Sequence, residues 1–269
     1  MLLATTAPTT LSLMRSPSLF RVLPAVATLL FACAWARGET AEELIKKGDV
    51  HYEKLQAAEA LKYYLPAEKL APDNARLLVR IAREYRHLMS DASKQAEKVR
   101  LGEIAVEYSK RATALAPKDP ETHLALAISY GKLLPLQGSK QQVNNSVLIK
   151  NSADKAIALQ PGNDLAWHVL GRYYLVLADV GGVRRTLAQV VYGTLPPAKH
   201  EDAVRCFSKA IELKPDRLMH YVELGRTYAQ MGQAAEARKY LTKGLAMPET
   251  EKDDPETKER GRQLLAKLR

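Results

Sequence analysis

Three arginines in this chain have closely similar neighbours and could together bind an anionic partner. Each follows a small residue and stands two positions before a tyrosine, as in Ala82-Arg83-Glu84-Tyr85, Gly171-Arg172-Tyr173-Tyr174 and Gly225-Arg226-Thr227-Tyr228. A guanidinium group can donate two parallel hydrogen bonds to a carboxylate or phosphate, which an ammonium group does less well. The competing interpretation is a solvated helix face with local ion pairs, such as Arg83 with Glu84 and Arg226 with Glu223.

No combination of residues predicts catalysis, a metal site or a cofactor. The sequence contains no phosphate-binding loop, dinucleotide fingerprint, nucleophile elbow or zinc-protease motif. Cys206 precedes Phe207 on a predicted packed helix, where a thiol is expected to be buried and inert. The histidines are scattered, and none has a second His or Cys at metal-ligand spacing: His51, His87, His123, His168, His200 and His220. We therefore expect a binding protein with no catalytic residues, no metal and no cofactor.

The elements that position the arginines are predicted by a recurring junction. Five times a helix-compatible stretch ends in a short apolar turn and a proline, at Pro72, Pro117, Pro161, Pro215 and Pro248. Proline stops the preceding helix, and an Asp or Asn shortly after it can cap the next one. Units of this kind bury a core only by stacking on their neighbours, so the sequence predicts an extended all-α array.

In the first unit, small and aromatic residues occupy the positions that a tetratricopeptide repeat reserves for them. Gly48, Ala60 and Ala67 let two antiparallel helices approach, while Tyr64 fills the space between them. The chain thus resembles a tetratricopeptide-repeat solenoid of about five antiparallel helix pairs, with a C-terminal capping helix and insertions in the middle units. The expected parts are a leader at 1–36 and an array at 37–269, with units at about 41–74, 75–118, 119–162, 163–216 and 217–248 and a capping helix at 254–268.

The three middle units are longer than the standard repeat, since successive prolines are 45, 44, 54 and 33 residues apart. In the second unit the surplus, residues 90–100, is polar and predicts a longer second helix. In the third, residues 135–147, Gly138 and Asn144-Asn145 predict turns. In the fourth, residues 180–199, helical spacing of apolar residues predicts a short extra helix at 183–192, and the insertion surface would comprise Arg184, Arg185 and Tyr192.

The second half of the chain resembles one family more narrowly. The segments Trp167-His168-Val169-Leu170-Gly171-Arg172-Tyr173-Tyr174 and Val191-Tyr192-Gly193-Thr194-Leu195-Pro196 are similar to the regulator of microtubule dynamics family. The resemblance covers roughly residues 40 to 269. It implies an insertion-bearing repeat array, in a family with microtubule-associated and mitochondrial or membrane-contact members, and it specifies no chemistry.

Residues 1–36 have the composition of a targeting segment. They contain no acidic residue, two arginines precede an apolar stretch, and Ala34-Trp35-Ala36 fits an export signal cleaved after Ala36. A retained anchor, a lipoprotein with a lipidated Cys33 and an organelle presequence are the alternatives. We expect an exported protein, periplasmic or membrane-tethered in a bacterium, and a mitochondrial or cytoplasmic location as the alternative in a eukaryote.

The first helix of each unit is expected to face a concave groove. The predicted groove residues are Arg76, Arg83, Arg86, Lys132, His168, Arg172 and Arg226. The chain has 40 basic and 30 acidic residues and a formal charge of +10, which suits an anionic partner. The leading hypothesis is a non-enzymatic scaffold whose groove binds an acidic peptide or helix, with Ile128 and Leu165 contacting its apolar residues. The alternatives are an anionic lipid or membrane surface and, from resemblance alone, microtubules; no nucleic acid partner is expected.

Overall fold

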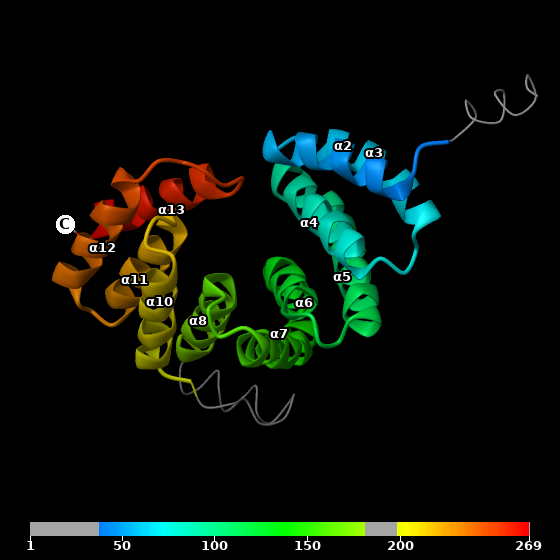
Figure 1. Ribbon diagram of the computed structural model, residues 1–269. Coiled ribbons are helices and arrows are strands. Elements are labelled where there is room, and N and C mark those ends of the chain that lie inside the picture. The colour runs from blue at the N-terminus through cyan, green and yellow to red at the C-terminus, as the bar shows by residue number, and fades with distance from the viewer. Residues whose placement is uncertain (1–37, 181–197, 269) are drawn as a thin grey trace, which may run out of the picture. The chain divides into compact units, whose positions relative to one another are not determined.

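The computed structural model describes residues 38–180 and 198–268, and within these ranges the chain forms helices and no strand (Figure 1). The leader at 1–36, the extra helix expected at 183–192 and the residues Arg184, Arg185 and Tyr192 lie outside the described residues. The helices are α2 (Ala41–Glu53), α3 (Ala57–Leu70), α4 (Ala75–Asp91), α5 (Gln95–Leu115), α6 (Pro120–Leu133), the 3-10 turn η1 (Leu134–Leu136), α7 (Ser139–Leu159), α8 (Asp164–Ala178), α10 (His200–Leu213), α11 (Leu218–Gln230), α12 (Ala234–Ala246) and α13 (Asp254–Lys267).

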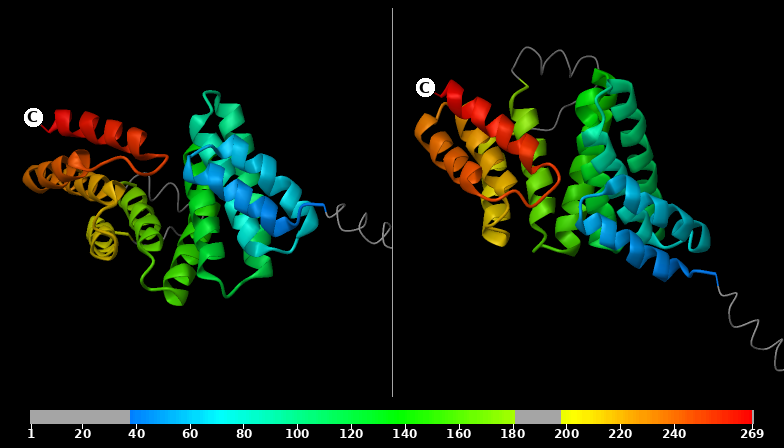
Figure 2. Two further views of the ribbon diagram at one scale, coloured as in Figure 1. Left: turned by 45° about the horizontal axis from the view of Figure 1, so that its top comes forward. Right: turned by 90° about the horizontal axis from the view of Figure 1, so that it is seen from above.

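Within Thr40–Arg269 the helices pack as consecutive pairs. Helix α2 packs on α3, α4 on α5, α6 on α7, α8 on α10 and α11 on α12, and each pair contacts the next one along the chain. Figure 2 shows the succession of pairs from two further directions. Helix α13 packs on α11 and α12 and covers the apolar end of the array. The expected all-α solenoid of tetratricopeptide type, with a C-terminal capping helix, is confirmed.

The proline junctions end the helices where the sequence predicts. Helices α3, α5, α7 and α10 each end at a leucine two residues before a proline. Asn74, Asp119 and Asn163 then cap α4, α6 and α8, because their side chains accept hydrogen bonds from backbone N–H groups of the first turn at 3.0 to 3.2 Å. The fourth junction differs: Arg217 is the N-cap residue of α11 and makes no side-chain cap.

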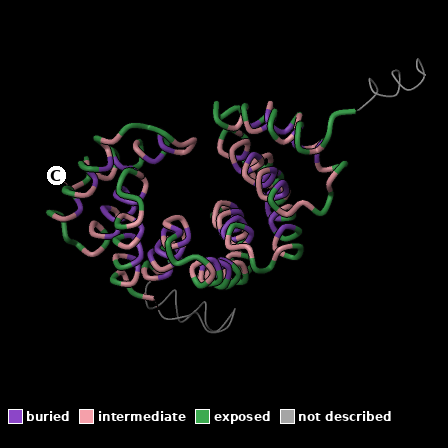
Figure 3. Tube along the Cα trace, viewed as in Figure 1, coloured by how far each residue is buried: buried purple, intermediate pink, exposed green. Residues whose placement is uncertain are grey.

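The core lies between the two helices of each pair and between neighbouring pairs, as the buried segments in Figure 3 show. Small residues permit this close packing. A methyl group on Gly48 would lie 2.3 Å from the ring of the fully buried Tyr64, and one on Gly171 would lie 2.8 Å from the ring of Phe207. The same pairing of a small residue with a large one therefore recurs in the first and fourth units, as the repeat frame requires.

Two of the insertions lengthen helices. Helices α5 and α7 each have 21 residues, so the longer second helix expected in the second unit is confirmed. The turn expected at Asn144-Asn145 is wrong, because both residues lie inside α7. The chain instead changes direction at η1 and Gly138, the N-cap of α7, and Asn145 donates a 2.8 Å hydrogen bond back to the side chain of Gln137.

Candidate functional site

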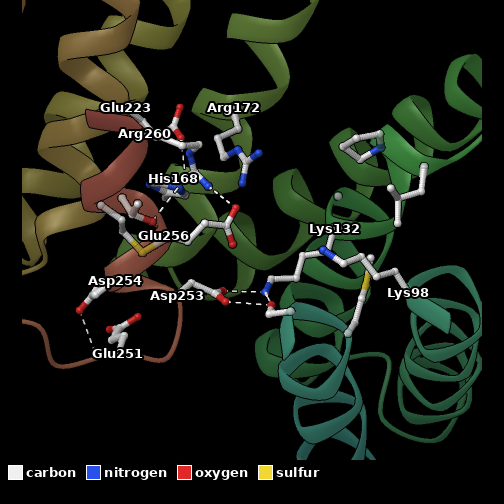
Figure 4. A pocket seen from close by; sticks show the side chains of 17 residues that line it. Lys98, Lys132, His168, Arg172, Glu223, Glu251, Asp253, Asp254, Glu256 and Arg260 are labelled. Carbon is white, nitrogen blue, oxygen red and sulfur yellow. Dashed lines mark hydrogen bonds and ion pairs between the residues drawn. The ribbon is translucent and has the colours of Figure 1, made fainter. Parts of the chain in front are cut away.

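The candidate site is a concave surface formed by α4, α6, α8 and α11 together with the connection between α12 and α13. We name residues 247–253 the acidic linker, since three of them are Glu or Asp and one is Lys. Three adjoining cavities of about 280, 360 and 680 Å³ open on this surface, and Lys132 and Asp253 contribute to all three. Figure 4 shows the smallest of them, with side chains from both sides of the surface.

Lys132 of α6 and Asp253 of the acidic linker form an ion pair at the centre of this surface. The Lys132 Nζ lies 2.6 Å from Oδ2 of Asp253, and the Lys132 side chain is only 22% exposed. The Ser90 hydroxyl of α4 donates to the other Asp253 oxygen at 2.9 Å. Burial by itself would raise the pKa of Asp253, but the Lys132 ammonium and the Ser90 hydrogen bond lower it overall. The carboxylate is thus held in its charged form.

The acidic linker also pairs with the ends of two other helices. Lys252 lies 2.8 Å from the carboxylate of Asp91, the last residue of α4. Glu251 lies 2.6 Å from Nε of Arg217, the residue just before α11. Opposite charges therefore join the linker to α4 and α6 on one side and to the start of α11 on the other.

Arg217 and two buried histidines form a polar network beside the linker. Arg217 pairs with Asp164, the first residue of α8, and Nε2 of His220 lies 2.9 Å from the same carboxylate. Nδ1 of His220 lies 2.9 Å from Nδ1 of His168, whose ring lines the two smaller cavities. Burial lowers the pKa of His168 well below its ordinary range, and a positive charge on His220 or Arg172 acts in the same direction. His168 is therefore neutral at physiological pH.

Arg86 lines the largest of the three cavities and is almost completely buried. It donates a 2.9 Å hydrogen bond to Oγ of Ser129, which is itself 2.9 Å from Oγ of Ser109. Burial, reinforced by the charge of Arg83, lowers the pKa of Arg86 to about 10. The guanidinium therefore stays charged at neutral pH and adds positive potential beneath the surface.

Arg83, Arg172 and Arg226 occupy equivalent positions in their units but have different surroundings. Arg83 lies 3.1 Å from the fully buried carboxylate of Glu84 and its guanidinium carbon lies 3.4 Å from the centroid of the Tyr52 ring. Arg226 lies 3.4 Å from the buried Glu223. Both local ion pairs of the competing interpretation are thus present, although their glutamates are buried rather than solvated.

Arg172 stands apart from the other two. It makes no ion pair or hydrogen bond with any other part of the chain that the structure describes, and it lines the two smaller cavities beside His168 and Lys132. The reason lies in the sequence, because the positions equivalent to Glu84 and Glu223 are Tyr173 and Val169 in this unit. Acidic residues, Asp253 among them, also line these cavities, but Arg172 pairs with none of them, so its guanidinium is available to an anionic group from outside.

An apolar surface adjoins Arg172. The polar residues of the cavity of about 360 Å³ include Arg172, Lys132, His168 and Asp253, and its apolar wall consists mainly of Ile128, Ile149, Leu165, Val169, Val176 and Leu177. Ile128 and Leu165 are among the residues that the sequence assigns to apolar contacts. This cavity could hold an apolar side chain next to a carboxylate.

The remaining predicted groove residues lie at the edges. Arg76 is exposed and pairs with Asp119 at 3.2 Å, and it lines none of these three cavities. Arg226 lines a separate hollow with Arg260 near the end of the array. Sequence reasoning missed four residues of the candidate site: Arg217, His220, Glu251 and Asp253. For the last two the available signal was the run Glu249-Thr250-Glu251-Lys252-Asp253-Asp254, which is acidic and close to a predicted basic groove.

Two further properties bear on the class of site. Across residues 38–180 and 198–268, no group of three His, Cys, Asp or Glu side chains has an arrangement that could hold a metal ion. In the same ranges, no helix combines the length and the apolar composition needed to span a bilayer.

Comparison with known proteins places the chain among helical-repeat proteins. Residues 40–269 match the family described as regulator of microtubule dynamics protein 1-3. The chain is 28% identical to regulator of microtubule dynamics protein 1 of Mus musculus over 84% of this chain and 74% of that protein. It is 25% identical to protein 2 of the same species, over 73% of this chain and 48% of that longer protein.

Solved structures show the same fold. A thermophilic tetratricopeptide-repeat protein of Thermus thermophilus superimposes with a TM-score of 0.62 at 18% identity, covering 84% of this chain and all of that one. MamA of Desulfovibrio magneticus RS-1 superimposes with a TM-score of 0.51 at 15% identity, covering 78% and 96% of the two chains. At these identities the likeness concerns the fold alone.

Proposed function

The chain belongs to the regulator of microtubule dynamics family, and from this premise we propose that it is a non-enzymatic scaffold whose concave surface binds an acidic peptide or helix of a partner protein. Arrays of this fold present extended concave surfaces that bind other proteins. The family is named for regulators of microtubule dynamics. The acidic nature of the partner is the specific part of the proposal.

One observation carries the proposal: Arg172 lines a cavity, next to an apolar wall, with no ion pair or hydrogen bond to any described residue. A carboxylate at this point would accept charge-assisted hydrogen bonds, which contribute about 1.5 to 3 kcal/mol each. An apolar side chain beside it would enter the cavity of about 360 Å³. The site therefore favours a segment that carries acidic and apolar residues close together.

The proposal is tested with a short fluorescent peptide in which Glu and Leu alternate. Fluorescence anisotropy should show binding to the wild-type protein and weaker binding, by about tenfold or more, to Arg172→Ala. Arg100→Ala is the matched control, because Arg100 is exposed on α5 and pairs only with Glu97 among the described residues. A peptide with Gln in place of Glu should bind poorly to all three proteins. Equal affinity of the Glu peptide for wild type and Arg172→Ala would refute an Arg172 site.

Association with microtubules is a second candidate, supported by family membership. It predicts that the protein co-sediments with polymerised tubulin and stays in the supernatant without it. Binding to an anionic lipid or membrane surface is the other alternative and predicts flotation with acidic but not neutral liposomes, decreasing with salt. Because the acidic peptide would compete only for the concave surface, adding it to either assay shows whether that surface is used.

We also propose export or membrane tethering, which the composition of residues 1–36 supports. Mass spectrometry of the protein from its native cells provides the test. An N-terminus at Arg37 would indicate an export signal, a lipidated Cys33 a tether, and an intact Met1 a retained segment. A mature N-terminus elsewhere, with the protein in the mitochondrial fraction, would support the presequence instead.

A further inference from the structure

We propose that the acidic linker occupies part of the partner's site, and that the partner supplies acidic groups which replace Glu251 and Asp253. The identity of the partner rests on the proposed function, whereas the occupancy of the surface by the linker does not. The linker reaches the concave surface at two points, with Asp253 on Lys132 and Ser90, and Glu251 on Arg217. Carboxylates of this chain thus already pair with cations of the surface.

The geometry of the linker favours presentation of these two acids. The nearly buried Asp254 accepts hydrogen bonds from the backbone N–H groups of Thr250 and Glu251 at 2.8 and 2.7 Å. This fixed turn presents Glu251 and Asp253 two residues apart in sequence. A partner that carries two acids at the same spacing could make the same pairs.

Displacement of the linker leaves the two cations in different states. Arg217 keeps its second carboxylate, Asp164. Lys132 keeps no ion-paired carboxylate among the described residues. The charge of the buried Arg86 acts on it unfavourably, and Glu256, with which it forms no ion pair, acts favourably. A mostly buried ammonium without a carboxylate is costly. The open surface therefore requires a new anion at Lys132, which is the reason that the incoming segment must be acidic.

The linker can leave this surface without unfolding the array. The helices on either side of it are held by apolar contacts, because Leu241 of α12 belongs to the cluster that contains Val222, and Leu264 of α13 packs against that cluster. Met247, the first residue of the linker, packs there too, so the part that can leave is the acidic segment after it. The ion pair of Lys252 with Asp91 is half exposed on the Asp91 side, and such pairs contribute only about 0 to 1 kcal/mol. Because the linker is tethered, however, its effective concentration at the surface is on the order of mM. Any external segment must compete with it.

The probe for this inference is a fluorescent peptide with the sequence of residues 247–255, tested by anisotropy on the full chain. Wild type should bind it poorly, since the site is occupied. The variant E251Q/D253N should bind it about tenfold or more tightly, because its own linker no longer competes. The control variant E201Q/E212Q removes two charges from α10, far from the linker in sequence, and should behave as wild type. Adding Lys132→Met to E251Q/D253N should abolish the gain.

Two results would contradict the inference. Equal affinity of wild type and E251Q/D253N for the peptide would show that the linker does not compete, and a gain that survives Lys132→Met would show that the peptide binds elsewhere. Circular dichroism checks that each variant is folded, and if the double variant is not, D253N alone is measured with the same expectations. Failure of the Arg172 experiment would refute the proposed function but leave this result intact, because here the readout depends on Lys132.

Discussion

The Nδ1 atoms of His168 and His220 lie 2.9 Å apart, although the two residues are 52 positions apart in the sequence. One Nδ1 must donate the proton that the other accepts, since two protonated nitrogens cannot share this distance favourably. Nε2 of His220 is 2.9 Å from Asp164, which suits an N–H donor at that position. Nδ1 of His220 would then accept the hydrogen bond that Nδ1 of His168 donates.

This network predicts that the protein loses stability in mild acid. Burial lowers the pKa of His168, so below about pH 6.5 the unfolded chain binds more protons than the folded protein. Above that pH, His168 should not change the free energy of unfolding. At lower pH, the free energy of unfolding should decrease as the pH falls, with a slope approaching about 1.4 kcal/mol per pH unit. Urea denaturation from pH 7.5 to 5 measures it. His168→Gln should flatten the slope and His123→Gln should not; an unchanged slope in His168→Gln would contradict the assignment.

Two glycines should respond oppositely to alanine. A methyl group on Gly171 would lie 2.8 to 3.0 Å from three atoms of the buried Phe207 ring, so Gly171→Ala should destabilise by about 1 to 3 kcal/mol. Gly131 lies inside α6 and has no atom within 4 Å of an added methyl group. Gly131→Ala should therefore stabilise by about 0.5 to 1 kcal/mol. Thermal melting of the two variants gives the comparison, and shifts of the same sign would argue against this packing.

Leu55 adopts a backbone conformation that glycine adopts in the equivalent turn of the last unit. Its φ is 57°, and φ of Gly232 is 75°. Both turns have the same backbone hydrogen bonds. In the first, the N–H groups of residues 55 and 56 donate to the carbonyl groups of residues 52 and 51; in the second, those of residues 232 and 233 donate to the carbonyl groups of residues 229 and 228. Leu55→Gly should stabilise by about 1 kcal/mol or less, and Gly232→Ala should destabilise by about 1 kcal/mol. Urea midpoints test both, and a loss of stability in Leu55→Gly would mean that its side chain contributes packing.

The Ser129 hydroxyl accepts a hydrogen bond from the buried guanidinium of Arg86. Removing this hydroxyl in Ser129→Ala leaves a buried guanidinium N–H without its acceptor, whereas the Ser109 hydroxyl keeps the Ala105 carbonyl; the change should cost about 1 to 3 kcal/mol of stability. Ser208→Ala, at an exposed position of α10, should change it by less than about 0.5 kcal/mol. Chemical denaturation distinguishes the two outcomes. A near-neutral Ser129→Ala would indicate that water replaces the hydroxyl.

The sequence predicts the repeat well because its determinants are local. Proline stops a helix within two residues, Asn163 caps the next helix within three, and Gly171 is matched to a large residue on the paired helix. Each of these effects acts within one unit and so leaves a periodic trace. The fold class could be read directly from that trace.

The candidate site could be predicted only in part, because its contacts join distant units. The frame places Arg83, Arg172 and Arg226 in register, but it does not reveal that only Arg172 lacks an ion pair within the described residues. Asparagine favours turns, so the sequence predicts a turn at Asn144-Asn145, whereas the packing of Val143 and Ile149 on either side keeps this stretch of α7 helical. The approach of Asp253 to Lys132 has no periodic trace at all.

The hydrogen bond from Ser90 to Asp253 joins residues 163 positions apart. A repeat array ordinarily behaves as a one-dimensional system, in which each unit is stabilised by its immediate neighbours and the ends can fray separately. Here the segment after the last helix pair is also tied to the second, so loosening of the C-terminal end is felt by helices early in the chain. The acidic linker thereby makes unfolding of the described array more cooperative than nearest-neighbour stacking alone would allow. A ligand that releases the linker would return the array toward independent units.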